Sequence, residues 1–577
     1  MGRLKHLLLL SFLTINSPVI LAQLKLEETK KIPVSTNETV YIHTNALTFV
    51  SGEMLLYKLY CLNPSDNTTS SISKIAYVEL VGTDKENVFH HKLFLENGTA
   101  QGDFFIPGTL KTGNYKLVGY TNWMLNKTNA KSFESDIFII NPYQSIAGNN
   151  PDASDSVGAI PETNAQPVHN SQADFSLDLN RKTYATREKV EFRVKTLLPN
   201  AKGHYSLSVR KISDLPEKTL QTAQTFANSE PTSTMAENAI LPELRGEMIS
   251  GTIVSKNTAS KVGNVTVALS VPGKSFGFKS VKTNASGKFI FNLDKAYYTP
   301  DIIIQVMDER RNDYTVSIDK PIDYDHSQLA FPSDINLKKN LKNAITERAI
   351  ASQVENAYYG KKTDSITKEN VNALFFDPLA KDYILDDFTR FPKLEETIVE
   401  IVKEMSFTKN DGKYAIHLRD IYAQVHTSEP SLVLVDGLLI QDINELFDYD
   451  TRNFYKVTIV PGGYYYGSNY FDGIVNFVTK NNDFVSKSKG DYMIKADVLR
   501  PLNKKTYYNQ DYSDKSKYER IPDYRYQLLW QPELTLSDAE NGISFFTSDV
   551  SGKFEIVLEG FTEKGIPVSL SDVIEVK

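Results

Sequence analysis

Short apolar runs separated by turn residues fill the first part of this chain, and their spacing constrains the fold more than any other feature. Runs of about four to eight residues that are rich in β-branched and aromatic side chains and bounded by turn residues predict strands. Such runs lie at 39–43, 54–61, 75–81, 90–95, 102–106, 114–121 and 135–140. Seven short strands at this spacing predict an antiparallel β-sandwich.

Two phrases in this region resemble a macroglobulin-like domain of the bacterial and complement type: ETVYIHTNALTFVSGEMLLYKLYCL and GTLKTGNYKLVGYTNWM. In that family the turn at Gly52 and Glu53 starts a strand. A later segment, DFSLDLNRKTYATREKVEFRVKT, repeats the plan of strand, turn and strand, so the resemblance implies a second, smaller unit there. Thioester members of the family trap proteases with a Gly-Cys-Gly-Glu-Gln motif, which this sequence lacks, so covalent trapping is excluded.

Residues 431–480 follow another pattern, with a strand at 433–435, a turn at Asp436 and Gly437, a helical run at 443–447, and strands at 456–460 and 474–479. This order resembles the plug domain of TonB-dependent outer-membrane receptors over about 100 residues. Plugs of that family sit inside a barrel of about 22 strands, which needs roughly 220 residues of strand. Only residues 481–577 follow here. We therefore expect a docking or structural module instead of a transporter.

Residues 244–319 have a third pattern, with strands near 250–254 and 265–269 and a tight turn in the sequence NASGKF. They resemble a carboxypeptidase regulatory-like sandwich, which is an accessory domain without catalytic residues. The expected fold class is mainly β, with tandem immunoglobulin- or macroglobulin-like sandwiches, one α+β plug-like domain and no β-barrel. The expected divisions are 1–22 (signal peptide), 23–142 (macroglobulin-like sandwich), 143–172 (flexible linker), 173–243 (second macroglobulin-like unit), 244–325 (regulatory-like sandwich), 326–380 (helical connector), 381–482 (plug-like domain) and 483–577 (immunoglobulin-like sandwich).

The first 23 residues have a basic start, an apolar centre at 7–13 and a small residue, Ala22. This build predicts a cleaved secretory signal, although a retained anchor is the alternative. Later apolar runs are shorter than the ~18 residues of a transmembrane helix. We expect an exported protein of the periplasm or outer membrane, with the cell surface as the alternative, from a bacterium of the Bacteroidetes type. The single cysteine, Cys61, excludes an internal disulfide and is expected to be a buried strand thiol.

Charge and motifs exclude several function classes. A formal net charge of −7 gives no basic footprint for nucleic acid. His90 and His91 are neighbours on a predicted strand, so they point to opposite faces and cannot chelate one ion. The acidic residues near the predicted helix at 443–447 lack EF-hand spacing, so we expect a solvated helix face in preference to a calcium site. They are Asp442, Glu445, Asp448 and Asp450. Two adjacent carboxylate pairs suit a helix start better than acid–base catalysis: Asp386 with Asp387, and Glu395 with Glu396. We expect no catalytic, cofactor or metal residue.

The aromatic segment 464–471 is the candidate interaction site. Aromatic and Gly residues together give a large contact surface of low conformational entropy, suited to a protein partner or to sugar stacking. The alternative is that the rings cover the core of their own sheet. The candidate partner-binding residues are Tyr464, Tyr465, Tyr466, Tyr470 and Phe471, and the candidate structural turns are Gly437, Gly462, Gly463 and Gly467.

The sequence favours a non-enzymatic exported scaffold or accessory subunit. Its expected partner is an outer-membrane protein complex or barrel protein that works in transport, secretion or assembly. The alternatives are a cell-surface adhesin or glycan-binding protein, and, as a third class, an enzyme whose site is not visible in linear motifs.

Overall fold

The structure is a computed structural model of the chain. It describes residues 37–577 except for 129–131, 145–170, 173, 198–200, 216–219, 228–233, 236–239, 258–259, 298, 333–338, 368–373, 378, 420–430, 468, 515–517 and 537–539. The predicted signal segment 1–22 and most of the predicted linker 143–172 lie outside the described residues. The described part is mainly β, as predicted, and each of its sheets is open, with two edge strands.

The first sandwich combines two sheets, whose strand orders are β1-β3-β6 and β2-β9-β7-β4-β5. Its strands are β1 (Thr39–Thr44), β2 (Thr48–Val50), β3 (Met54–Leu62), β4 (Ile75–Gly82), β5 (Asn87–Phe94), β6 (Thr99–Phe105), β7 (Gly113–Tyr120) and β9 (Phe133–Ile140). All seven predicted strands are present, and β2 was not predicted. The interior is apolar, and Cys61 is fully buried in it as expected.

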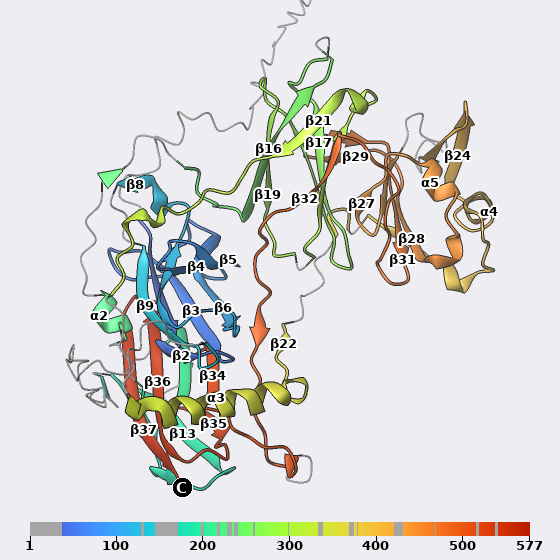
Figure 1. Cartoon of the computed structure of the whole chain (residues 1–577). Coiled ribbons are helices and arrows are strands. Elements are labelled where there is room, and N and C mark those ends of the chain that lie inside the picture. The colour runs from blue at the N-terminus through green and yellow to red at the C-terminus, as the bar shows by residue number, and fades with distance from the viewer. Residues whose placement is uncertain are drawn as a thin grey trace, which may run out of the picture. The chain divides into compact units, whose positions relative to one another are not determined.

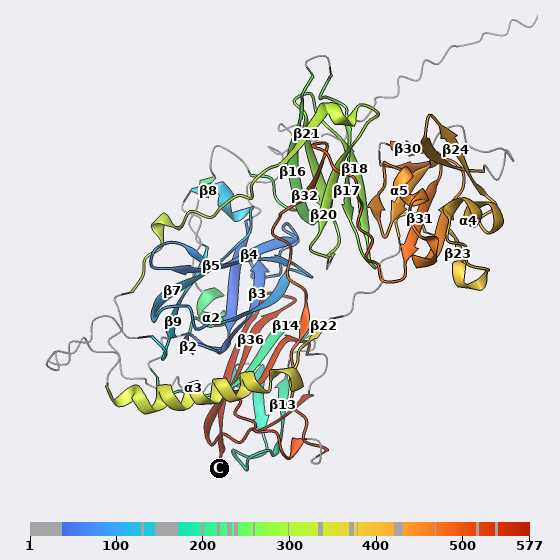
Figure 2. The ribbon, with the colours of Figure 1, turned by 45° about the vertical axis from the view of Figure 1, so that its right-hand side comes forward.

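The second sandwich is built from two distant parts of the chain. Its sheets have the orders β10-β11-β13-β35 and β12-β37-β36-β14-β34. The strands are β10 (Ser171–Gln172), β11 (Phe175–Leu179), β12 (Thr183–Tyr184), β13 (Lys189–Thr196), β14 (Gly203–Lys211), β34 (Gln527–Leu534), β35 (Glu540–Phe546), β36 (Gly552–Thr562) and β37 (Pro567–Val576). In Figures 1 and 2 the red strands at the end of the chain lie beside these blue-green ones.

This arrangement corrects the predicted division into a unit at 173–243 and a separate sandwich at 483–577. β14 lies between β34 and β36 in one sheet, and β35 pairs with β13 in the other. The two segments also share one apolar core. Neither segment has enough strands to cover its own apolar faces, so each completes the other.

The third sandwich also recruits a distant strand. Its sheets are β19-β16-β21 and β18-β17-β20-β32. The strands are β16 (Glu247–Ser255), β17 (Thr266–Val271), β18 (Gly277–Lys282), β19 (Lys288–Leu293), β20 (Ile302–Met307), β21 (Tyr314–Ile318) and β32 (Met493–Ala496). β32, seen beside β20 in Figure 2, pairs with it in antiparallel fashion. Residues 493–496, predicted to belong to a terminal sandwich, therefore belong here.

The α+β unit holds the segment expected to be plug-like. Its main sheet has the order β23-β28-β31-β26-β27, in which β26 and β31 run parallel. The elements are β23 (Lys381–Ile384), α4 (Leu394–Glu400), β24 (Met405–Asn410), β25 (Lys413–Leu418), β26 (Leu432–Val435), β27 (Leu438–Leu439), α5 (Asn444–Phe447), β28 (Phe454–Val460), β29 (Tyr464–Tyr466), β30 (Asn469–Phe471) and β31 (Ile474–Thr479). α4 ends at Glu400, and Met405 pairs with Leu418 and starts the hairpin of β24 and β25.

A helix, α3 (Lys342–Ala357), lies in the predicted connector. It buries Arg348 and small side chains, and Arg348 forms an ion pair with Glu53. Shorter elements are η1 (Met124–Asn126), β8 (Lys127–Thr128), α2 (Ala223–Ala227), β15 (Thr234–Met235), η2 (Arg311–Asp313), η3 (His326–Gln328), η4 (Lys339–Leu341), η5 (Tyr359–Lys361), β22 (Ser365–Ile366), η6 (Leu385–Asp387), η7 (Thr451–Asn453) and β33 (Lys505–Thr506). Among the described residues, no helix is both long and apolar enough to cross a bilayer.

Candidate functional site

The aromatic segment folds into the two-stranded hairpin of β29 and β30. Tyr464 lies opposite Phe471, and Tyr465 lies opposite Tyr470. Successive side chains on a strand point to opposite faces, and directly paired residues share a face. Tyr464, Tyr466 and Phe471 therefore lie on one face, and Tyr465 and Tyr470 lie on the other.

The first face is anchored to neighbouring segments. The Tyr466 hydroxyl donates to the backbone carbonyl of Phe278 at 2.7 Å, and the Tyr466 ring centroid is 4.5 Å from that of Phe375. The Tyr464 hydroxyl donates to the backbone carbonyl of Phe375. Burial raises the pKa of Tyr466, so the hydroxyl remains a donor at neutral pH. Phe471 packs against the same apolar cluster.

The second face is open to solvent. Tyr465 is 78% exposed and Tyr470 is 52% exposed, although both are large aromatic residues. Their ring centroids are 4.9 Å apart and the ring planes are tilted by 59°. The Tyr470 hydroxyl donates to the Asp472 carboxylate at 2.8 Å, which fixes one of the rings. We call Tyr465 and Tyr470 the exposed tyrosine pair.

Two of the four candidate turn glycines, Gly467 and Gly437, have backbone conformations that residues with a side chain rarely adopt. Gly467, at the hairpin turn, has φ +60°, and Gly437 has φ +83°. A Cβ at Gly437 would overlap the side chain of Phe276. Gly462 also has a positive φ, whereas a Cβ at Gly463 would overlap the Tyr470 ring.

Backbone and amide hydrogen bonds connect the α+β unit to the third sandwich beside this hairpin. The Leu439 carbonyl accepts from Gln305 Nε2 at 2.9 Å, and its N–H donates to Ser270 Oγ at 3.1 Å. The Gly273 N–H donates to the Asp436 carbonyl at 3.0 Å. These bonds join β27 and the turn before it to the third sandwich.

The sequence did not indicate the residues that receive the anchored face. Phe278 lies on β18, and Phe375 lies in the segment predicted as a helical connector, at 374–377. The adjacent rings of Phe375 and Phe376 were the one available signal, because two neighbouring aromatic residues outside a strand need an apolar surface to cover them.

The other candidate residues do not converge. His90 faces Glu79, with Nε2 to Oε1 at 3.3 Å, while His91 Nδ1 lies 3.0 Å from the Tyr57 hydroxyl. The two imidazoles thus occupy different environments, as the strand alternation predicted. Desolvation lowers the pKa of both rings, to about 4 for His91.

Acidic side chains around α5 accept hydrogen bonds from other parts of the chain and from their own turns. Glu445 accepts from Ser486 Oγ at 2.9 Å, and Asp450 accepts from the Arg452 N–H at 3.0 Å. Asp442 accepts from the Asn444 N–H at 3.3 Å. In the part of the chain that the structure describes, no group of three or more His, Cys, Asp or Glu side chains is placed to hold a metal ion.

The remaining candidate carboxylates lie near the start of the α+β unit. Asp386 forms an ion pair with Arg390 at 3.5 Å, and Glu395 Oε1 accepts from the Tyr414 hydroxyl at 3.1 Å. Asp387 lies in η6 and Glu396 in the first turn of α4. Asp386 and Glu395 thus have different partners within the described part of the chain.

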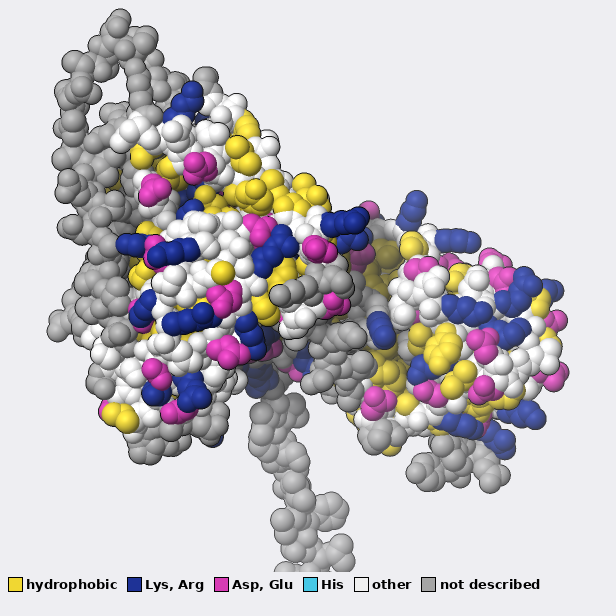
Figure 3. Space-filling model, turned by 90° about the horizontal axis from the view of Figure 1, so that it is seen from below, with side chains coloured by type: hydrophobic (Ala, Val, Ile, Leu, Met, Phe, Trp, Pro, Cys, Tyr) yellow, Lys and Arg dark blue, Asp and Glu magenta, His cyan; other side chains and the backbone are white. Residues whose placement is uncertain are grey.

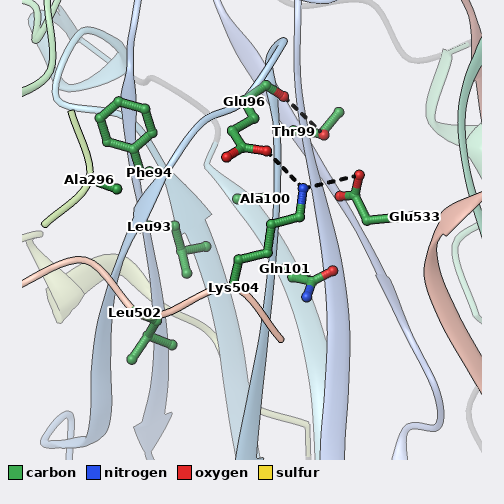
Figure 4. Close-up of a pocket in the computed structure, with 10 residues that line it drawn as sticks. All are labelled: Leu93, Phe94, Glu96, Thr99, Ala100, Gln101, Ala296, Leu502, Lys504 and Glu533. Atoms are coloured by element: carbon green, nitrogen blue, oxygen red, sulfur yellow. Dashed lines mark hydrogen bonds and ion pairs between the residues drawn. The ribbon is translucent and has the colours of Figure 1, made fainter. Parts of the chain in front are cut away.

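A small cavity of about 30 Å³ lies beside β5 and β6 (Figure 4). Lys504 reaches into its wall, where its Nζ lies 2.7 Å from Glu96 and 3.4 Å from Glu533. A cavity of this size holds about one or two water molecules. It is therefore part of the packing between these charged groups and too small for an organic substrate.

Comparisons with known proteins give distant structural likeness only. No protein-family model matches the chain, and no curated protein matches it. One solved structure that aligns with it is α-2-macroglobulin of Escherichia coli activated by porcine elastase. The two are 8% identical, the alignment covers 94% of this chain and 44% of that chain, and the TM-score is 0.24. Salmonella α-2-macroglobulin reacted with methylamine aligns at 10% identity over 93% and 39% of the two chains, with a TM-score of 0.23.

This chain therefore spans less than half of those proteins. Scores of this size carry no argument about activity or domain arrangement. The fold class rests on the sheets described above, which are β-sandwiches of the kind that the sequence predicted.

Proposed function

We propose that this protein is a non-enzymatic exported scaffold or accessory subunit that docks to an outer-membrane protein complex. The observation that carries the proposal is the hairpin with one anchored face and one exposed aromatic face. Tyr465 and Tyr470 form the docking contact, and Tyr464, Tyr466 and Phe471 hold it in place. The export signal and the plug resemblance of the sequence support the outer membrane as its location.

The anchored face makes the exposed tyrosine pair suited to binding. Ordering a flexible loop on association costs conformational entropy, and a hairpin that is already fixed avoids part of this cost. Tyrosine has a large ring and a polar tip, and it is enriched among residues that dominate binding energy at interfaces. On the face drawn in Figure 3, Lys and Arg side chains alternate with Asp and Glu, which supports a protein partner over a polyanion.

A glycan is the second candidate partner, because exposed aromatic rings also stack on sugars. The 59° tilt between Tyr465 and Tyr470 means that the two rings do not form one flat platform. A sugar ring could stack on only one of them, whereas the irregular surface of a protein can contact both. The tilt therefore favours the protein partner.

The test is copurification with a tagged chain from detergent-solubilised outer membranes of its native cells. We expect the double variant Tyr465→Ser/Tyr470→Ser to bind its partner more weakly by about 2 kcal/mol, which is roughly thirtyfold in affinity. The partner should then be lost from the copurified material. The matched control is Tyr455→Ser/Phe388→Ser, which removes two aromatic side chains of the same unit that are 43% and 44% exposed.

Both variants should keep the thermal unfolding midpoint of the parent. Equal partner recovery with the two variants would refute docking through the exposed tyrosine pair. Retention of the parent on a glycan array, lost only in the tyrosine variant, would assign the site to the glycan-binding alternative. Recovery of the chain solely in the cytoplasmic fraction would refute the proposed location.

A further inference from the structure

The third sandwich has a regular edge strand, β19, whose outer side pairs with no other strand of the described residues. The order of its sheet, whose strands are labelled in Figure 1, is β19-β16-β21. β19 pairs with β16 in antiparallel fashion and without a register shift. Its sequence, KFIFNL, contains no proline, and exposed residues alternate with buried ones. An edge of this kind is a template for an added strand.

The hydrogen-bond pattern shows which backbone groups of β19 point outward. The Ile253 N–H donates to the Gly287 carbonyl at 2.9 Å, so these two residues form a hydrogen-bonded pair. Bonded and non-bonded pairs alternate along an antiparallel ladder. The residues whose backbone groups face β16 are therefore Phe289, Phe291 and Leu293. Those whose backbone groups face outward are Lys288, Ile290 and Asn292.

The turn before β19 uses the outward groups of Lys288. The Lys288 N–H donates to Asn284 Oδ1 at 2.9 Å, and the Lys288 carbonyl accepts from the Asn284 N–H at 2.9 Å. No hydrogen bond from another described residue reaches the backbone groups of Ile290 or Asn292. These two residues therefore offer free N–H and carbonyl groups at the edge of the sheet.

Several other edge strands are less suited to an added strand. On β18 the Phe278 carbonyl accepts from the Tyr466 hydroxyl at 2.7 Å. β34 contains Pro532, and its pairing with β14 shifts register. β35 is an edge strand too, but Glu540 is its one charged residue, so pairing with itself would bring no opposite charges together.

The edge of β19 is complementary to itself. In an antiparallel pair of two copies centred on Phe291, Ile290 of one copy lies opposite Asn292 of the other. The free N–H and carbonyl groups of each residue then meet free groups of the other copy. A register centred on Ile290 would instead place Asn292 opposite Lys288, whose backbone groups are already bonded to the turn.

The register centred on Phe291 also brings opposite charges together. It places Lys288 of one copy opposite Asp294 of the other. Lys288 is exposed and forms no ion pair with another described residue. Asp294 lies 2.7 Å from Lys279, but its side chain is 50% exposed and can accept a second cation. Opposite charges that face each other across two strands stabilise the pairing.

We propose that β19 pairs with β19 of a second copy of this chain, which joins the two three-stranded sheets into one. The contact is small beside the ~1,600 Å² of a standard interface, so the dimer is reversible and depends on concentration. The inference does not rest on the exposed tyrosine pair, so either surface can fail its test without the other.

Sedimentation equilibrium of the full chain over a range of concentrations measures the dimer. We expect the parent to dimerise with a Kd of about 100 µM. Lys288→Glu and Asp294→Lys each place like charges opposite one another at both ends of the pairing, and each should weaken dimerisation about tenfold. In an equal mixture of the two variants, each copy supplies the charge that the other lacks. A heterodimer should therefore form with the affinity of the parent.

The matched control is Lys282→Glu, which reverses an exposed charge on β18 and changes the net charge as Lys288→Glu does. It should dimerise like the parent, and all variants should keep the unfolding midpoint of the parent. The proposal is overturned if the parent stays monomeric up to about 1 mM, if either edge variant dimerises like the parent, or if the mixture does not restore the dimer. An equal loss with Lys282→Glu would assign the effect to net charge and overturn it as well.

Discussion

Glu559 on β36 should make the stability of the second sandwich depend on pH near neutrality. The side chain is 2% exposed. Its Oε2 accepts from the Ala223 N–H at 2.7 Å, from Ser569 Oγ at 2.8 Å and from the Tyr41 hydroxyl at 3.1 Å. Desolvation outweighs these donors and raises the pKa of Glu559 from 4.5 to about 7.

The sign of the effect follows from the protons bound in each state. Between pH 4.5 and about 7 the folded chain holds the Glu559 proton and the unfolded chain has lost it. The contribution to stability is therefore complete below pH 4.5 and is lost as the pH rises to about 7. Each pH unit is worth about 1.4 kcal/mol for one proton, so the whole interval corresponds to about 3 kcal/mol.

The variant Glu559→Gln keeps an acceptor oxygen and cannot ionise. Relative to the parent, its free energy of unfolding should rise by about 3 kcal/mol between pH 4.5 and pH 8. Nearby His43 does not interfere, because burial lowers its pKa to about 3 and it remains neutral throughout. Other buried carboxyls with raised pKa values, such as Glu243 and Glu355, titrate equally in both proteins and cancel in the difference.

Both proteins carry Trp123→Phe, which leaves Trp530 as the sole tryptophan of the chain. Urea unfolding followed by Trp530 emission then gives the free energy of unfolding of each protein. Trp530 lies on β34, in the same sheet as Glu559, and its ring centroid is 5.3 Å from that of His43 on β1, so its emission reports the contact of the first and second sandwiches in which Glu559 lies. The reasoning would be refuted if the difference in free energy of unfolding between variant and parent stayed constant from pH 4.5 to pH 8. It would also be refuted if the variant became more stable relative to the parent as the pH was lowered.

Three further substitutions test the packing. Gly437→Val should destabilise the α+β unit by about 1–3 kcal/mol or more, because φ is +83° and the new side chain overlaps Phe276, and limited proteolysis of that unit should accelerate. Arg348→Met should cost about 3–5 kcal/mol in calorimetric unfolding, because it leaves the buried carboxylate of Glu53 with only its weaker arginine contact. Tyr466→Phe should cost about 1 kcal/mol in urea unfolding, because it removes the hydroxyl bond to the third sandwich, and no loss would show that the ring alone anchors the hairpin.

The sequence predicted local structure well, because strand length, alternation and turn residues are local properties. The strands of the first sandwich and the order strand, turn, helix and strand at 432–479 appear close to their predicted positions. Domain boundaries were predicted less well, because they depend on which strands pair. Val194 pairs with Asn541, and no pattern near either residue encodes that choice.

The sequence predicted the division of the aromatic site into two faces but not which face is buried, for the same reason. Alternation on a strand indicates that Tyr464 and Tyr466 share a face and that Tyr465 takes the opposite one. Which face is buried depends on Phe278 and Phe375, which come from other parts of the chain. Core cover describes the face of Tyr464 and Tyr466, and the proposed partner binding concerns the opposite face.

The divided second sandwich has a consequence for how the chain folds during synthesis. β14 is flanked in its sheet by β34 and β36, and Ser208 meets Gln527 319 positions later. Until the ribosome has made those later strands, both hydrogen-bonding edges of β14 and the apolar residues around it have no native cover. Such edges are sites of mispairing between chains. The third sandwich and the α+β unit lie between the two halves in the sequence, so the edges of β14 stay without their native partners for the whole of that interval.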